Sequence, residues 1–314
     1  MAHLEGKVAI VTGAGRGIGR GEALLLAKHG AKIVVNDPGA HFDGTGGETK
    51  VADQVVQEIK AAGGEAVASY EPVNDFNLSK KIIQKALDSF GRLDILVNNA
   101  GILRDKMSFN LSEEDWDSVI SVHLKGTFNC TKHAAEYWRA EHKAGKTVKG
   151  RIINTTSDAG LLGNPGQSNY GAAKAAIAAF TIIVAQELQR YGITVNAVAP
   201  VARTRLTTDA TPSLAALFSQ KPPEGQFDIL APENIAPMVA YLASDDAQNI
   251  TGQVFRVAGD TIWLLGGWHS IGKIKNDKKR WEPEQIGPKL KELLKNAPPR
   301  EDMTTPLRDM MSGG

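Results

Sequence analysis

The sequence predicts an α/β protein built on one doubly wound parallel sheet. Short, β-branched apolar runs alternate along the chain with longer segments of helical periodicity. The runs are apolar throughout rather than at every second residue, which indicates strands covered by helices on both faces of the sheet. Repeated strand–helix–strand units imply parallel pairing through right-handed crossovers.

The expected elements follow one another in a regular order. Strands are expected at 7–13, 31–37, 65–70, 93–101, 150–157 and 193–200, within a sheet of about seven. Helices are expected at about 18–29, 51–64, 79–91, 113–140 and 168–191. No internal repeat or Pro-rich linker interrupts the chain before about Gly259. We therefore expect one domain over 1–265.

The segment 266–314 does not continue this alternation. It is basic and punctuated by Pro, with an amphipathic helix near Ile286 to Leu294 and a run of Lys and Arg at Gly272 to Arg280. It is too short to be a second domain, so we expect an extension packed on the first domain or on a neighbouring subunit.

Composition excludes several classes of protein. In 314 residues, 42% are hydrophobic, 23% are charged and the formal net charge is +1, so neither nucleic acid nor an acidic membrane surface is expected as a partner. The single cysteine, Cys130, lies in a helical pattern and is expected in the core. The N-terminus has no secretion signal and no apolar run reaches the length of a membrane span, so a cytoplasmic protein is expected.

A glycine-rich turn, "TGAGRGIG", connects the first expected strand to the first helix. Gly13, Gly17 and Gly19 allow a tight turn and let backbone N–H groups approach a pyrophosphate at the helix N-terminus. The required context of a strand before and a helix after is present, so we expect a bound dinucleotide on a Rossmann-type sheet.

Asp37, at the end of the second strand, favours NAD. A carboxylate there accepts hydrogen bonds from a ribose hydroxyl and repels the 2′-phosphate of NADP. Arg16 in the glycine turn acts in the opposite sense, because a guanidinium can bind that phosphate. An arginine can turn to solvent, whereas a carboxylate facing the phosphate is costly, so NAD is preferred.

The stretch "SNYGAAKAA" places Tyr170 and Lys174 one helical turn apart, on the same helix face. Ser157 ends the fifth strand at the same edge of the sheet. A lysine ammonium close to the phenol, with a positively charged nicotinamide nearby, is expected to lower the pKa of the tyrosine. The tyrosine then exchanges a proton with an alcohol while the serine holds the substrate oxygen. This arrangement suits hydride transfer between an alcohol carbon and a nicotinamide.

The motifs "TGAGRGIG", "NNAG", "TTS" and "YGAAK", in this order, resemble those of the short-chain dehydrogenase/reductase family over about Gly6 to Ala258. The resemblance implies that Tyr170 is the acid/base, that Ser157 orients the substrate oxygen and that Lys174 also binds the nicotinamide ribose. It implies a homodimer or homotetramer. Further cofactor contacts are expected at Ile18, Val73, Asn98, Ala100, Gly101, Pro200 and Thr204.

His123 departs from the family pattern. Most members have an asparagine at that place, where it holds a water in a proton relay, but here the helix reads "VHLKGTF". An imidazole can donate and accept hydrogen bonds, so His123 either takes part in the relay or is a packed helix residue.

Four stretches, "VVNDPGAHFDGTGGE", "NNAGILRDK", "VHLKGTF" and "NPGQSNYGAAK", resemble one branch of the family, the dehydrogenase units of peroxisomal multifunctional enzymes of type 2. That resemblance implies NAD-dependent oxidation of (3R)-hydroxyacyl-CoA in fatty-acid or steroid side-chain β-oxidation. The alternatives are a 17β-hydroxysteroid dehydrogenase, a 3-oxoacyl carrier-protein reductase and, from another class, a non-catalytic NAD-binding protein.

The expected substrate is a small molecule, an acyl-CoA thioester or a steroid. Residues Pro200 to Asp228 are expected to cover it, and the lysines of Gly272 to Arg280 to assist the phosphates of CoA. The seven histidines show no ligand-type spacing with acids or cysteines, so no metal is expected.

Overall fold

The computed structural model describes residues 4–48, 50–204, 221–223 and 225–305. One eight-stranded sheet runs through it in the order β3-β2-β1-β4-β5-β6-β7-β8, one strand more than the sequence indicated. The strands are β1 (Val8–Thr12), β2 (Lys32–Asn36), β3 (Ala66–Ser69), β4 (Ile95–Asn98), β5 (Arg151–Thr155), β6 (Thr194–Val201), β7 (Val254–Ala258) and β8 (Thr261–Leu265).

The strands from β3 to β7 pair in parallel, as expected. Strand β1 has β2 on one side and β4 on the other, so the chain reverses its direction of travel across the sheet after β3. A crevice forms outside the carboxyl ends of the strands at such a reversal, and ligands bind there in open α/β sheets.

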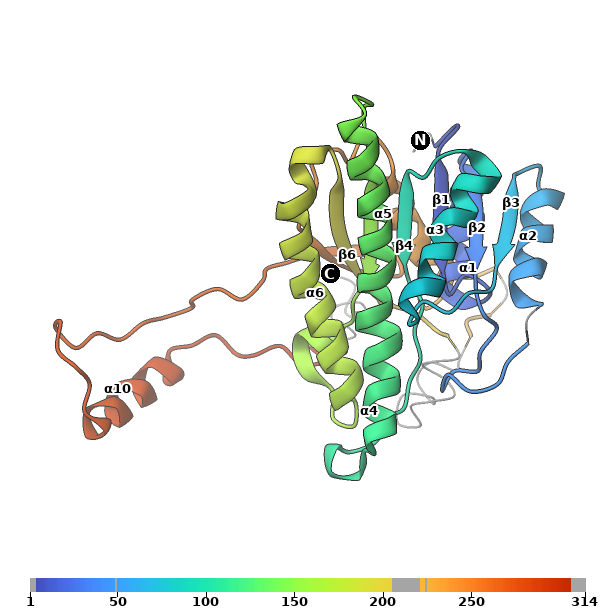
Figure 1. Ribbon diagram of the computed structural model, residues 1–314. Helices are drawn as coiled ribbons and strands as arrows, with labels where there is room; N and C mark the ends of the chain where they lie inside the picture. Colours follow the sequence, from blue (N-terminus) through green and yellow to red (C-terminus); the bar gives the residue numbers. More distant parts are fainter. Residues whose placement is uncertain (1–3, 49, 205–220, 224, 306–314) are drawn as a thin grey trace. The chain divides into compact units, whose positions relative to one another are not determined.

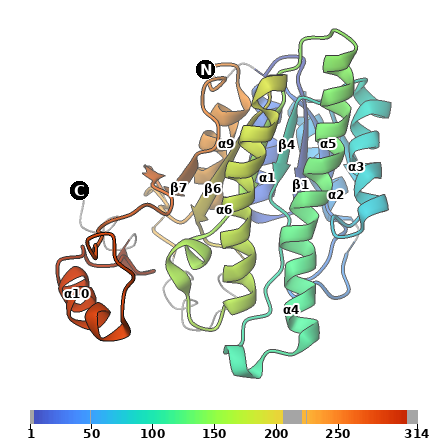
Figure 2. The same ribbon diagram turned by 60° about the vertical axis from the view of Figure 1, so that its left-hand side comes forward.

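Helices cover both faces of the sheet, as Figure 1 and Figure 2 show. The first core cluster joins α1, α2 and α9 to the sheet, and the second joins α3, α5 and α6 to its other face. In β2, Ile33 and Val35 belong to the first cluster and Val34 to the second. The helices are α1 (Gly17–Lys28), α2 (Val51–Ala61), α3 (Phe76–Phe90), α5 (Gly126–Lys143), α6 (Ser168–Leu188) and α9 (Ala236–Ala243).

Local signals explain where α3 begins and ends. The carboxylate of Asp75 accepts hydrogen bonds from the backbone N–H groups of Asn77 and Leu78, which satisfies free donors at the helix start. Gly91 ends the helix with φ of 77°, a left-handed conformation that glycine adopts without strain. Cys130 of α5 is fully buried in the second core cluster, as predicted.

The long helix expected at 113–140 is interrupted. It consists of α4 (Glu113–Ile120), a π-helical turn η2 (Ser121–Lys125) and α5. A second π-helical turn, η3 (Ala159–Gly163), follows β5. Both π-helical turns contain or adjoin residues predicted for the active site, where such irregular turns are frequent.

The expectation that no apolar run is long enough to span a bilayer was wrong for one helix. Within the described residues, Ser168–Tyr191 reaches that length and apolarity, with mean hydropathy of 1.4. Buried residues make up 44% of this window, and core helices of globular proteins pass the same test. The helix packs on β6 and η3, so its apolar composition has a structural explanation within the domain.

The chain divides into two compact units, Met1–Leu264 and Leu265–Gly314. Both core clusters lie in the first unit. In the second unit, α10 (Pro283–Lys295) packs back on the preceding segment: Lys289 lies over the ring of Trp281 at 4.9 Å, and its Nζ donates to the backbone oxygen of Lys275. None of the described residues of the second unit is buried.

Candidate active site

The glycine turn between β1 and α1 packs too closely for larger residues. A Cβ at Gly13 would lie 2.8 Å from the Cα of Ala100, and one at Gly19 would collide with the Asn99 side chain. Gly13 and Gly17 have φ of 65° and 55°, which favours glycine. No side chain caps the N-terminus of α1, so the N–H groups of its first turn are available to an anion.

Gly17 differs from its neighbours because it has room beside it. A Cβ there would meet only the side chain of Thr204, at 3.6 Å or more. Thr204 follows β6, so the structure brings two predicted cofactor residues from distant parts of the chain to the same place. Ile18, the next residue of α1, packs instead against the first core cluster.

Asp37 lies against the glycine turn, where the sequence predicted a cofactor residue. Its carboxylate accepts hydrogen bonds from the backbone N–H of Gly15 at 2.9 Å and of Gly39 at 2.7 Å. A Cβ at Gly15 would lie 2.8 Å from the Asp37 Oδ2. The carboxylate is therefore fixed at the mouth of the turn, beside the first turn of α1.

Arg16, the cation of the glycine turn, pairs with an acidic residue. Its guanidinium lies 3.4 Å from the Glu48 carboxylate, in the loop between β2 and α2. Arg16 and Asp37 were predicted from the sequence as opposing charges of the cofactor site, whereas Glu48 was not predicted. No local pattern marks Glu48 as the partner, because the loop brings it back to the turn from a distance of 32 residues.

The two asparagines of "NNAG" have different tasks. Asn98 is buried and donates to Thr131 and Asn154, at 3.1 and 2.9 Å, so it joins β4 to α5 and β5. Asn99 donates to the backbone oxygens of Thr12 and Gly13 and holds the glycine turn. Asn98 thus supports the neighbouring strand, and Asn99 is a residue that the sequence reading missed.

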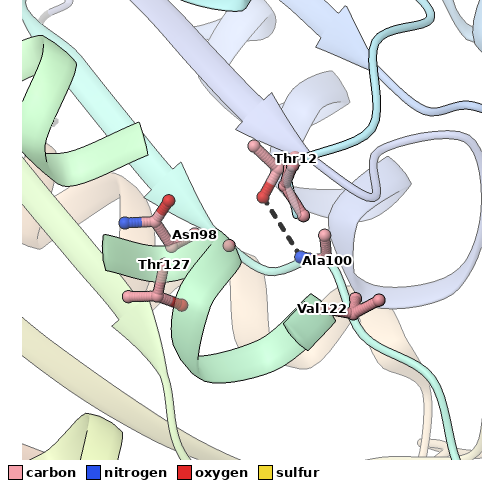
Figure 3. Close-up of a pocket in the computed structure, with 7 residues that line it drawn as sticks. Thr12, Asn98, Ala100, Val122 and Thr127 are labelled. Carbon is pink, nitrogen blue, oxygen red and sulfur yellow. Dashed lines mark hydrogen bonds between the residues drawn. The ribbon is translucent and has the colours of Figure 1, made fainter. Parts of the chain in front are cut away.

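Thr12 is a second missed residue. Its hydroxyl accepts hydrogen bonds from the backbone N–H of Asn99 and of Ala100 at 3.0 and 3.1 Å, and thereby ties β1 to β4. Figure 3 shows the hydrogen bond between Thr12 and Ala100 in a small pocket. The pocket is lined by Thr12, Val73, Asn98, Ala100, Val122, Gly126 and Thr127. The predicted residues Val73, Asn98 and Ala100 are thereby brought together.

Ser157, Tyr170 and Lys174 come together beyond the end of β5. Tyr170 makes a hydrogen bond with Ser157, and the Lys174 Nζ lies 5.5 Å from the centre of the Tyr170 ring. The same Nζ donates to the backbone oxygen of Thr155 at 2.6 Å. The lysine is 3% exposed, so its side chain is held within the site rather than reaching solvent.

Burial dominates the protonation of this group. It raises the pKa of Tyr170 to about 12, against the effect of the Ser157 hydrogen bond, and lowers the pKa of Lys174 to about 7. The lowering expected from Lys174 together with a nicotinamide close by stays a prediction, because burial alone sets the direction for these side chains. Removing a phenol from water disfavours the phenolate more than its neighbours favour it.

His123 lies in the π-helical turn η2, against the same tyrosine. Its ring meets the ring of Tyr170 edge to face, with 5.1 Å between the centres. The Nε2 lies 2.7 Å from the backbone oxygen and 3.0 Å from the backbone nitrogen of Ile102. Burial, assisted by the charge of Lys174, lowers the pKa of His123 to about 3, so the imidazole is neutral near pH 7.

Gly101 and Pro200 complete the predicted set. A Cβ at Gly101 would collide with the His123 ring, so this glycine provides the space that the imidazole fills. Pro200 lies in β6, opposite Val257 of β7. Of the segment expected to cover the substrate, residues 205–220 and 224 lie outside the described residues. Within the described residues, no group of His, Cys, Asp and Glu gathers as metal ligands.

Comparison with known proteins identifies similar enzymes. The family model for short chain dehydrogenases matches residues 7–214. Hydroxyacyl-CoA dehydrogenase ChsB1 of Mycobacterium tuberculosis is 41% identical over 306 residues, which cover 96% of this chain and 92% of that protein. A 3-oxoacyl-[acyl-carrier-protein] reductase of Synechocystis is 45% identical over 267 residues, covering 83% of this chain and 99% of the reductase.

Two further matches concern a longer enzyme and a solved structure. The peroxisomal hydratase-dehydrogenase-epimerase of Neurospora crassa is 42% identical over 285 residues, or 90% of this chain, but the match spans only 30% of that enzyme. The crystal structure of a short chain dehydrogenase from Mycobacterium avium superposes with a TM-score of 0.83 at 48% identity, covering 95% of this chain and 98% of that one.

Proposed function

Because the chain belongs to the short-chain dehydrogenase family, whose members generally bind NAD or NADP, we propose that it oxidises a (3R)-3-hydroxyacyl-CoA to the 3-oxoacyl-CoA with NAD. The observation that carries the proposal is the contact of Ser157, Tyr170 and Lys174 at the edge of the sheet that also holds the glycine turn. Its relation to a hydroxyacyl-CoA dehydrogenase over nearly the whole chain supports the substrate class.

Each residue of the triad has one task in this reaction. Ser157 and Tyr170 hold the 3-hydroxyl oxygen through hydrogen bonds, and Tyr170 accepts the hydroxyl proton. A protonated Lys174 favours the phenolate that must form. Bound NAD supplies the acceptor for the hydride that leaves C3, so that the carbon–oxygen bond becomes a carbonyl. In the reverse direction, Tyr170 donates the proton to the carbonyl oxygen.

The residues around the glycine turn fit NAD better than NADP. Asp37 faces the turn with both carboxylate oxygens occupied by backbone donors, and Glu48 pairs with the arginine that a 2′-phosphate requires. Gly17 and Thr204 leave room beside the uncapped start of α1 for the pyrophosphate. These contacts support a catabolic oxidation.

The first test is the rate of 3-oxoacyl-CoA reduction with NADH and with NADPH. We expect NADH to be preferred and Tyr170→Phe to lose about two orders of magnitude in kcat/KM, because the proton donor is removed. Tyr241→Phe, on the half-exposed tyrosine of α9, is the matched control and should retain wild-type activity. Activity with NADPH alone would contradict the NAD assignment.

The rival with a specific observation in its favour is reduction of a 3-oxoacyl carrier protein, since the chain is 45% identical to such a reductase. Direct comparison of the acyl-CoA with the acyl carrier protein carrying the same acyl group separates the two substrates. A free 17β-hydroxysteroid is a further alternative in the same assay. Tight NADH binding without turnover of any of these would favour a non-catalytic NAD-binding protein.

We also propose that the enzyme is a homo-oligomer. Apolar side chains remain exposed on α5 and α6, where Phe128 and Ile183 are 43% and 56% exposed. Phe128 also contacts Phe180 across the two helices, with 6.4 Å between the ring centres. A second copy of the chain would cover this face. Ile183→Lys should therefore lower the oligomeric state in light scattering, whereas Gln54→Lys, at an exposed position of α2, should not.

A further inference from the structure

Asn169, the residue before the proposed catalytic tyrosine, is completely buried near the start of α6. Its amide nitrogen donates to the backbone oxygens of Arg104 at 3.1 Å and of Asp115 at 3.2 Å. Its Oδ1 accepts a hydrogen bond from the backbone N–H of Tyr170 at 2.8 Å. Both donors and the acceptor of the amide are therefore used, which fixes the orientation of the side chain.

The bond to Tyr170 satisfies a free donor at the start of α6. The first N–H groups of a helix have no acceptor in a preceding turn. Gln167, the residue at the N-cap, makes no side-chain capping bond. The amide oxygen of Asn169 supplies an acceptor instead, so the backbone of the tyrosine is held by a buried side chain.

The other two bonds of the amide attach the start of α6 to α4 and to segment 102–106, which follows the "NNAG" motif. This segment is fixed by contacts of its own. The Arg104 Nε donates to the backbone oxygen of Asp43, in the loop between β2 and α2, at 3.0 Å. Lys106 forms an isolated parallel bridge with Gln167. The backbone oxygen of Arg104 is therefore a fixed anchor for α6.

Segment 102–106 also supports the ring of Tyr170. The Nε2 of His123 lies within hydrogen-bond distance of the backbone oxygen and nitrogen of Ile102. The His123 ring in turn meets the Tyr170 ring edge to face. The same short segment thus holds the backbone of the tyrosine through Asn169 and its ring through His123. A shift of α6 against this segment would move the phenol away from Ser157.

We propose that Asn169 is a positioning residue that fixes Tyr170 against segment 102–106 for proton transfer. This inference rests on the proposed function, because it assumes that Tyr170 exchanges a proton with the substrate oxygen. Without the amide, two backbone oxygens lose a donor and the Tyr170 N–H loses its acceptor, so the start of α6 can move. A misplacement of about 1 Å in a reacting group can cost about a hundredfold in rate.

The test compares Asn169→Ala with Asn169→Asp, which keeps an oxygen for the Tyr170 N–H but removes both donors. In both variants we expect kcat to fall at least about tenfold. The dissociation constant of NADH should change less than about twofold, because the glycine turn is untouched. If alanine prevents folding, Asn169→Ser, whose hydroxyl retains one donor, should show the same separation of kcat from NADH affinity to a smaller degree.

Asn196→Ala is the matched control. Asn196 of β6 is 1% exposed, donates to the backbone oxygen of Ile250 at 2.8 Å and accepts from the backbone N–H of Gln253 at 3.1 Å. It lies near the start of β6, away from the carboxyl edge of the sheet. Its loss should lower the melting temperature as Asn169→Ala does and leave kcat unchanged. An equal fall of kcat in this control, or wild-type kcat in Asn169→Asp, would overturn the proposal.

A spectroscopic readout distinguishes this inference from the proposed function. If the wild-type enzyme turns over none of the tested substrates, the proposed function fails. The NMR signal of ring-labelled Tyr170, identified among the five tyrosines by its loss in Tyr170→Phe, still reports the position of the phenol beside the His123 ring. Asn169→Ala and Asn169→Asp should shift this signal more than Asn196→Ala does. An unchanged signal in both Asn169 variants would overturn the inference whatever the substrate.

Discussion

The protonation of Tyr170 separates the two directions of the proposed reaction. Because its pKa is raised to about 12, the phenol remains protonated through neutral pH and can donate its proton. We predict that the phenol contributes no ionisation to kcat/KM for reduction between about pH 6 and 9, so that a change in this range follows Lys174, whose pKa is lowered to about 7. Oxidation needs the phenolate, so its kcat/KM should rise with pH only while Lys174 remains protonated. Initial rates in both directions provide the check.

His123 should leave no mark on these profiles. Its pKa of about 3 means that the imidazole stays neutral over the whole working range. A reduction rate that falls between about pH 6 and 7 in the wild type but not in His123→Asn would contradict this prediction, because it would assign that ionisation to the histidine.

Coenzyme choice should follow the charges around Arg16. We predict that Asp37→Ser combined with Glu48→Gln lowers the dissociation constant of NADPH at least about tenfold, because a repelling carboxylate is removed and the guanidinium is released. Titration of protein fluorescence with each nucleotide measures the change. Adding Arg16→Met to the same background is the control and should abolish the gain.

Glu22 of α1 makes the free energy of unfolding depend on pH, independently of the candidate active site. Its side chain is buried, its Oε2 has no hydrogen-bond partner among the described residues, and burial raises its pKa to about 8. Between about pH 4.5 and 8 the unfolded chain has lost this proton while the folded chain keeps it. The free energy of unfolding therefore falls as pH rises through that window.

Glu22→Gln should remove this dependence. We predict that its melting temperature exceeds the wild-type value at about pH 8 and that the difference shrinks toward about pH 5. Glu187→Gln, on an exposed glutamate of α6, should follow the wild-type curve. A constant difference across the range would indicate an effect of packing instead of ionisation.

Site residues that lie close together in the sequence could be predicted, whereas residues that come into contact only in the folded chain could not. Tyr170 and Lys174 share a helix face, and the glycine turn is contiguous, so both could be identified from the chain alone. Glu48 and Asn169 reach their partners across 32 and 65 residues, and no periodic pattern encodes such contacts. The effect of burial on the pKa of Tyr170 could not be predicted either, because burial is a property of the folded environment.

Among the elements, the close contact between η3 and α6 brings the serine to the tyrosine. A Cβ at Gly171 would lie 2.9 Å from the backbone oxygen of Ala159, so Gly171→Ala must separate the two elements. We predict a loss of about 1–3 kcal/mol in stability, typical of overpacking, together with at least about a tenfold fall in kcat. Thermal unfolding and initial rates measure the two effects.

Gly21→Ala in α1 is the matched control for this prediction. Its Cβ would meet the Cα of Glu233 at 3.4 Å, an ordinary contact, and alanine favours the helix. Activity should be unchanged and stability equal or slightly higher. An equal loss of kcat in the two variants would show that the spacing of η3 and α6 is not what positions Ser157.

The order of strands and helices could be predicted because both faces of the sheet are buried and the apolar runs are continuous. The two π-helical turns could not be predicted from the sequence. An extra residue inside a helix leaves the apolar pattern of 113–140 nearly intact, while the hydrogen bonds change over Ser121–Lys125. The family resemblance is confirmed by the match over residues 7–214.

For the whole molecule, the division into Met1–Leu264 and Leu265–Gly314 suggests where stability resides. Both apolar clusters belong to the first unit, and no described residue of the second is buried. In the second unit, apolar side chains are instead exposed, with Trp268 at 98% and Leu294 at 65%. A segment of this size without a core is not expected to fold alone.

We predict that a chain ending at Leu265 folds cooperatively, with a melting temperature within about 4 °C of the full chain and unchanged affinity for NADH. The reason is that the shortened chain keeps the glycine turn, Asp37 and both core clusters. Differential scanning calorimetry and nucleotide titration are the measurements. A much larger drop in melting temperature at constant molecular mass would show that the extension stabilises its own subunit. A smaller molecular assembly after truncation would instead place the extension against a neighbouring subunit.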